Sequence, residues 1–121
     1  MTNMASAIGW DVYLSQMDML KAEGQKRLDE WKSPAFNQRV LQLRAQGDYI
    51  AAARECLVKV QEVIKALSNV ASGWQRVYNA GHPAGNQVLQ QHFRAMRCKS
   101  FFEELRSGFL DELPECRRLA M

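Results

Sequence analysis

The apolar residues of this 121-residue chain recur at steps of three and four, which is the period of an amphipathic helix. Gly47-Asp48, Gly81-His82-Pro83 and Pro114 interrupt this pattern, and Ser33-Pro34 combines an N-cap residue with a proline at the first helical position. The pattern therefore predicts four helices, over residues 11–32, 34–46, 49–80 and 86–113.

The third predicted helix is the central element. One row of apolar residues follows it in alternating steps of four and three, at Tyr49, Ala53, Cys56, Val60, Val63, Leu67, Val70, Trp74 and Val77. A second row lies beside the first, at Ile50, Leu57, Ile64, Ala71 and Tyr78. At about 100° per residue the two rows cover roughly half of the helix circumference. We therefore predict an all-α, four-helix up-and-down bundle-like domain with a long central helix.

Length and composition are those of one globular domain over residues 1–121, because 47% of the residues are hydrophobic and 24% are charged. Residues 1–9 and 114–121 lie outside the predicted helices, and we expect them to be less ordered tails. The three cysteines, Cys56, Cys98 and Cys116, form no CxxC pair, which favours reduced thiols. The first ten residues lack the pattern of a signal peptide, and no apolar run is long enough to cross a membrane. We expect a cytoplasmic protein.

The motifs of catalysis and cofactor binding are missing from the sequence. It contains no GxSxG elbow, and its scattered glycines form neither a phosphate loop nor a dinucleotide fingerprint. Neither His82 nor His92 has a second histidine three or four residues away, as a helical metal site would. Adjacent carboxylates such as Glu103 and Glu104 diverge by about 100° on a helix and cannot share a proton. We expect no enzyme activity, no metal and no cofactor.

The net charge of +3 is spread evenly, since division at Gly47 and Gly81 leaves about +1 in each third. Nucleic-acid binding needs concentrated cations, so this distribution argues against it. The most basic stretch interleaves Arg94, Arg97 and Lys99 with phenylalanines that are able to stack on bases. A nucleic-acid-binding transcriptional regulator that uses these three residues, with Arg39 and Arg44 of the second helix, is the alternative function.

The first predicted helix is apolar on two sides. Its core face contains Trp10, Leu14, Met17, Gly24 and Leu28, whereas Ile8, Val12 and Met19 fall on the opposite side. A helix with two apolar faces needs two packing partners. Either this helix is sandwiched inside the bundle or its second face is an external interface.

The last predicted helix has an apolar stripe that changes sides at about Arg97. Before Arg97 the apolar cluster contains Val88, Leu89, His92, Phe93 and Met96, and after it the nearly opposite cluster contains Cys98, Phe101, Phe102, Leu105, Phe109 and Leu113. Either the helix is divided there, or its two halves pack against different partners. Because no proline or glycine lies at the change, the second explanation is favoured.

These patterns predict a non-enzymatic protein–protein interaction module: a small regulatory adaptor, anti-activator or secretion-type chaperone that docks apolar helix faces on a partner protein. A homodimer is expected, because a second copy is the simplest cover for exposed apolar surface. The expected partner-binding residues are Ile8, Val12, Met19, Phe101, Phe102, Leu105 and Phe109.

Overall fold

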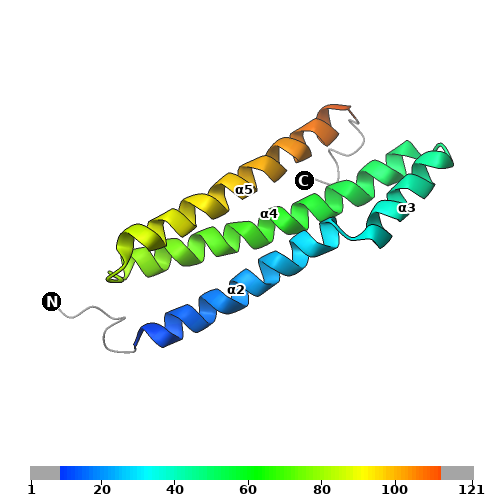
Figure 1. The fold of residues 1–121 in the computed structure, drawn as a ribbon. Helices are drawn as coiled ribbons and strands as arrows, with labels where there is room; N and C mark the ends of the chain where they lie inside the picture. The colour runs from blue at the N-terminus through cyan, green and yellow to red at the C-terminus, as the bar shows by residue number, and fades with distance from the viewer. Residues whose placement is uncertain (1–8, 113–121) are drawn as a thin grey trace.

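The computed structural model describes residues 9–112, which form four helices (Figure 1). They are α2 (Trp10–Trp31), α3 (Pro34–Ala45), α4 (Tyr49–Asn79) and α5 (Gly85–Glu112). Every boundary lies within one residue of its predicted position. The described part contains no strand, so the all-α prediction is confirmed. The predicted tails lie outside the described residues, apart from Gly9.

Local capping interactions set the helix boundaries. The Ser33 hydroxyl accepts a hydrogen bond from the Phe36 amide at 3.5 Å, and Pro34 follows at the first helical position. The Asp48 carboxylate accepts one from the Ala51 amide at 3.3 Å. Gly47 precedes Asp48 with a φ of 80°, a left-handed conformation that glycine adopts without strain. The chain therefore reverses tightly between α3 and α4.

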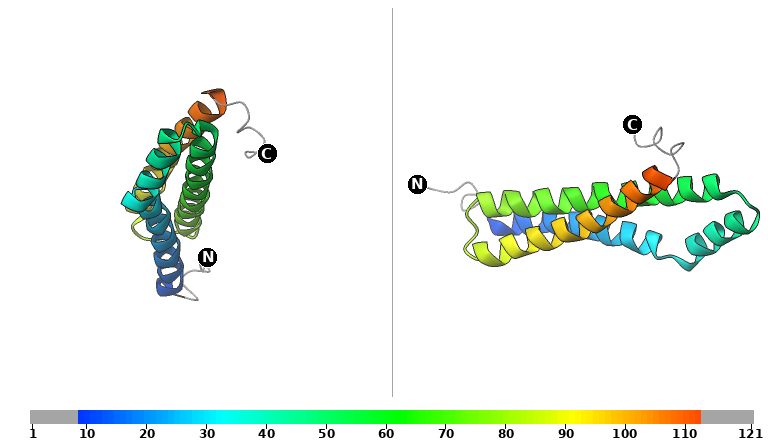
Figure 2. Two further views of the ribbon diagram at one scale, coloured as in Figure 1. Left: turned by 90° about the vertical axis from the view of Figure 1, so that its right-hand side faces the viewer. Right: turned by 90° about the horizontal axis from the view of Figure 1, so that it is seen from above.

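The helices form three long rods, because α2 and α3 follow one another along α4 in the same direction (Figures 1 and 2). On α4, the residues that meet α3 include Glu55 and Lys59, and those that meet α2 include Val70 and Gly73. These four positions fall within about 60° of one another on the helix. The Ser33-Pro34 start signal thus divides one rod into two pieces, and α5 covers another side of α4.

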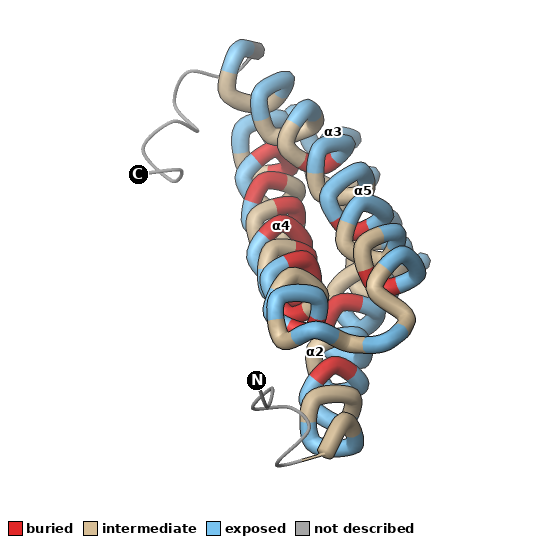
Figure 3. The backbone as a smooth tube through the Cα atoms, turned by 90° about the vertical axis from the view of Figure 1, so that its left-hand side faces the viewer, coloured by how far each residue is buried: buried red, intermediate tan, exposed pale blue. Residues whose placement is uncertain are grey.

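The core follows the two predicted apolar rows of α4 (Figure 3). Leu57, Val60 and Val63 have no exposed surface, and Met17 of α2 and Phe102 of α5 are buried with 2% and 4% exposed. The buried residues form three clusters along α4; α5 contributes to all three, and α2 contributes to two of them. The rows end in exposed residues, Tyr49 and Ile50 at the start of α4 and Tyr78 near its end. The long central helix is therefore confirmed.

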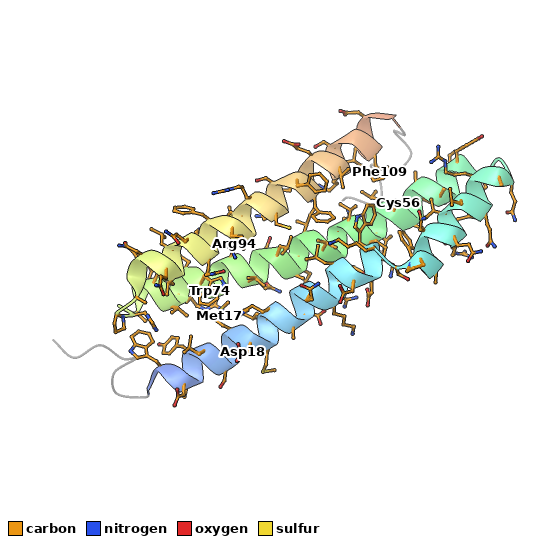
Figure 4. All side chains as sticks on the ribbon, in the orientation of Figure 1. Met17, Asp18, Cys56, Trp74, Arg94 and Phe109 are labelled. Atoms are coloured by element: carbon orange, nitrogen blue, oxygen red, sulfur yellow. The ribbon has the colours of Figure 1, made fainter. Side chains whose placement is uncertain are left out.

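Close packing of α2 against α4 depends on a glycine whose role the apolar pattern does not indicate. A Cβ atom on Gly73 would lie 2.5 Å from the Met17 Sδ and 2.9 Å from the Leu20 Cδ1. Any side chain at position 73 would push the two helices apart or displace Met17. Figure 4 shows Met17 beside Trp74, in the space between α2 and α4.

The apolar stripe of α5 does not change sides, so that prediction is wrong. The helix is continuous, and Val88, Ala95 and Phe102 are buried at intervals of seven residues. Two helical turns span about seven residues, so these three positions share one inward face. Phe93 and Met96, which the sequence analysis placed in the first cluster, are 52% and 38% exposed. The small Ala95 is the inward residue of this turn, and the larger neighbours point outward.

Candidate protein-docking surface

The predicted partner-binding residues of α2 lie on its outer face. Val12 and Met19 are 45% and 75% exposed, and their spacing of seven residues places them on one side of the helix. Ile8 lies outside the described residues. The opposite face, with Met17 and Gly24, is buried as predicted. Of the two alternatives for this helix, the sandwich is therefore excluded by the exposure of Val12 and Met19.

The predicted partner-binding residues of α5 divide between core and surface. Phe102 is 4% exposed and meets the Trp31 ring edge-on, with 6.0 Å between the ring centroids. Leu105 and Phe109 are partly buried and pack on the same core cluster. Phe101 is 57% exposed. The prediction that these four residues form one face turned away from the core is wrong. Only Phe101 points outward.

Phe101 of α5 and Met19 of α2 do not combine into one surface. Phe102 lies level with Trp31, because their rings are in contact. Met19 precedes Trp31 by twelve residues, which is about 18 Å along a helix. Phe101 and Met19 are therefore on different helices and at different levels of the molecule.

The three cations of the alternative nucleic-acid site do not share one face. Arg94 and Arg97 are exposed and lie about 60° apart around α5, whereas Lys99 is about 140° from Arg94 and is partly covered. The concentrated patch that phosphate binding requires is not formed by these residues.

A groove of about 720 Å³ lies where α2 ends and α3 packs against α4. We call it the α3 groove. Its apolar lining comes from Ala35 and Phe36 of α3 and from Val58 of α4, which is 44% exposed. Its charged lining contains Glu30, Arg39, Arg54, Glu55 and Lys59.

Most charges around the α3 groove are paired with one another. The guanidinium of Arg39 donates to both carboxylate oxygens of Glu55 at 2.8 and 2.9 Å. The Lys59 Nζ lies 3.6 Å from the Glu30 carboxylate and 5.8 Å from the centroid of the Phe36 ring. Arg54 has no ion-pair partner among the described residues. The groove is thus apolar inside, with one unmatched positive charge at its edge.

The Glu30 carboxylate is held in its ionised form beneath this groove. Partial burial by itself raises the pKa of Glu30, but hydrogen bonding to Arg27 and the charges of Arg27 and Lys59 outweigh burial, so the pKa lies below its ordinary value. The Arg27 guanidinium, 3.2 Å from Glu30, also lies 3.4 Å from Glu62 of α4. This network ties the end of α2 to α4 and fixes one wall of the α3 groove.

The helix that forms the other wall is weakly held. Not one residue of α3 is buried, although the helix carries Phe36, Val40, Leu41 and Leu43. A helix of twelve residues is marginal in isolation and obtains its stability from packing of an apolar face. Leu41 is 55% exposed, so part of that apolar surface has no cover within the described residues. A further packing partner would stabilise α3.

The described thiols are not activated, and the described residues form no metal cluster. Burial raises the pKa of the Cys56 thiol, with a further contribution from Glu55, and burial likewise raises the pKa of the Cys98 thiol. Both thiols are therefore protonated and weakly nucleophilic at neutral pH. Within residues 9–112, no three His, Cys, Asp or Glu side chains are grouped so that they could hold a metal ion.

Comparisons with protein-family models, with curated proteins and with solved structures find no match for this chain. None of the described helices combines the length and the apolar character needed to cross a membrane.

Proposed function

We propose that this chain is a non-enzymatic protein–protein interaction module that holds an amphipathic helix of a partner protein in the α3 groove. The observation that carries this proposal is a helix without any buried residue beside a groove with an apolar lining. Side chains of a docked helix would cover Phe36 and Val58, and the paired charges would form a polar rim around the contact.

A docked helix would also change the architecture at this end of the molecule. The three rods would gain a fourth member beside α3 and α4, which would complete a four-helix bundle locally. The partner helix would be occluded while it is bound. This mode of action is that of a small regulatory adaptor, anti-activator or secretion-type chaperone, and we place it in the cytoplasm because Cys56 and Cys98 are free cysteines, as is usual in a reducing compartment.

Replacement of Val58 by glutamate tests the proposal, because it places a carboxylate among the apolar residues that line the groove. Ser72→Glu is the matched control. Ser72 is also exposed on α4, on the same side of the helix, about 21 Å further along it. The measurement is quantitative mass spectrometry of the proteins that co-purify with each tagged chain from native lysate.

A specific partner is expected to be recovered equally with the wild-type chain and with Ser72→Glu. Its recovery should fall about tenfold or more with Val58→Glu, the equivalent of about 1.4 kcal/mol of binding free energy. Circular dichroism should show that all three chains have the same helix content. Equal recovery of the same proteins with all three chains would contradict docking in the α3 groove.

A further inference from the structure

We propose that the helix held in the α3 groove belongs to a second copy of this chain and is the end of its α5. This inference rests on the proposed function, because it names the occupant of the same groove. We call residues 101–112 the α5 end.

Charge complementarity is the first argument. The α5 end carries four acidic residues, Glu103, Glu104, Asp111 and Glu112, and one cation, Arg106, which lies 4.0 Å from Glu103. By contrast, α3 carries no acidic residue. Its Arg39 is paired with Glu55 of α4, whereas Arg54 at the groove lacks an ion-pair partner among the described residues. Opposite potentials of this kind orient an encounter and fix its register. An acidic helix end is therefore the occupant that this groove favours.

Exposed apolar surface on the α5 end is the second argument. Phe101 is 57% exposed, and it borders an open hollow of about 300 Å³ that is also lined by Glu104, Leu105 and Gly108. Its ring is supported from behind by Phe102, with the ring centroids 5.3 Å apart. A supported aromatic ring on an acidic helix supplies the anchor that would enter the groove beside Phe36 and Val58.

Gly108 supplies a third, independent argument. A glycine inside a helix weakens that helix, and it is usually retained where another group approaches the backbone closely. Among the described residues, nothing lies within 4 Å of the position that a Cβ on Gly108 would occupy. The backbone at Gly108 is therefore left open by the described part of the chain, and a helix of a second copy would be able to approach it closely.

Both surfaces lie at the same end of the molecule, which permits reciprocal pairing. Phe109 of the α5 end lines a hollow together with Cys56 of α4, two residues before Val58 of the α3 groove (Figure 4). In a two-fold dimer the α5 end of each copy would enter the α3 groove of the other. The same contact would then form twice around one axis, as in other symmetric dimers.

Charge reversal tests this pairing, with sedimentation equilibrium of the full chain at low salt as the measurement. Arg54→Glu and Glu104→Arg are each expected to weaken the dimer about tenfold or more, because each places like charges in both contacts. A mixture of the two variants should restore the dimer, since each groove then faces an α5 end of opposite charge at the altered position. Arg76→Glu, which reverses an exposed charge far along α4, is the control and should have no effect.

Gly108→Gln provides a second readout that separates assembly from folding. Glutamine favours the helix more than glycine, so the variant should unfold at a higher denaturant concentration when it is monomeric. Its longer side chain should nevertheless weaken the dimer about tenfold or more. Raised salt should weaken the wild-type dimer and leave the fold intact.

The outcomes separate this inference from the proposed function. In one outcome the wild-type chain is monomeric, and Val58→Glu abolishes binding of a different partner protein. This outcome would show that a second copy is not the occupant, and it would leave the α3 groove as a docking site. A dimer that neither Val58→Glu nor Arg54→Glu weakens would overturn both. A dimer weakened by each single reversal and restored in the mixture supports the pairing.

Discussion

Replacement of Phe102 by alanine is expected to lower the free energy of unfolding by about 3–5 kcal/mol, the usual cost of removing a buried phenylalanine side chain. Phe102 is 4% exposed and packs among Val60, Val63 and Trp31. A cavity at this position would lie between all three rods. Chemical denaturation at high dilution, followed by circular dichroism, measures the effect.

Phe101→Ala is the matched control for this substitution, because the two residues are adjacent and of the same type. Phe101 is 57% exposed, so its loss should change the stability of the monomer by no more than about 0.5–1 kcal/mol. Similar costs for the two substitutions would contradict the inward direction of Phe102 and the single continuous face of α5.

Leu67→Ala is expected to cost about 2–5 kcal/mol, since Leu67 is 6% exposed in the middle of α4. It packs in the same cluster as Ile64 and Leu28, so its removal leaves a cavity that neighbouring side chains fill only in part. Leu41→Ala on α3 is the control. Leu41 is 55% exposed, and its replacement should change the free energy of unfolding by no more than about 0.5 kcal/mol. A denaturation midpoint that hardly moves for Leu67→Ala would refute the central position of α4.

The helix boundaries and the core face of α4 were predictable because local features determine them. The caps at Ser33 and Asp48 and the turn at Gly47 act within a few residues, and the apolar rows of α4 repeat over its whole length. Period and capping are therefore enough to place this helix and to identify which of its residues are buried.

The inward face of α5 was not predictable from large apolar residues, because one inward position is the small Ala95. Phe93 and Met96 are more hydrophobic, but the groove between α4 and α2 is filled at this level by other side chains, including Met17 and Trp74. The row of Val88, Ala95 and Phe102 is recognisable in the sequence only if alanine is counted among the apolar residues that recur every seven positions.

The α3 groove was not predictable from the sequence either, because its position depends on where α2 ends relative to α4. The one signal was Val58, an apolar residue on the otherwise polar side of α4 between Arg54 and Glu62. The predicted four-helix bundle treated α3 as one of its four full members, so Val58 was not recognised as part of a groove. In the structure α3 instead continues the line of α2 and packs against α4 without a buried residue.

Hydrogen exchange of the α3 amides, measured by mass spectrometry, tests the central claim that α3 borders a docking groove. At high dilution the amides of α3 should exchange much faster than those of α4 between Leu57 and Val70, because α3 has no buried residue. When the groove is occupied, by a second copy at high protein concentration or by a captured partner, exchange in α3 should slow by about tenfold or more. Slow exchange in α3 at high dilution, or rates that do not change when the chain is bound, would contradict the account.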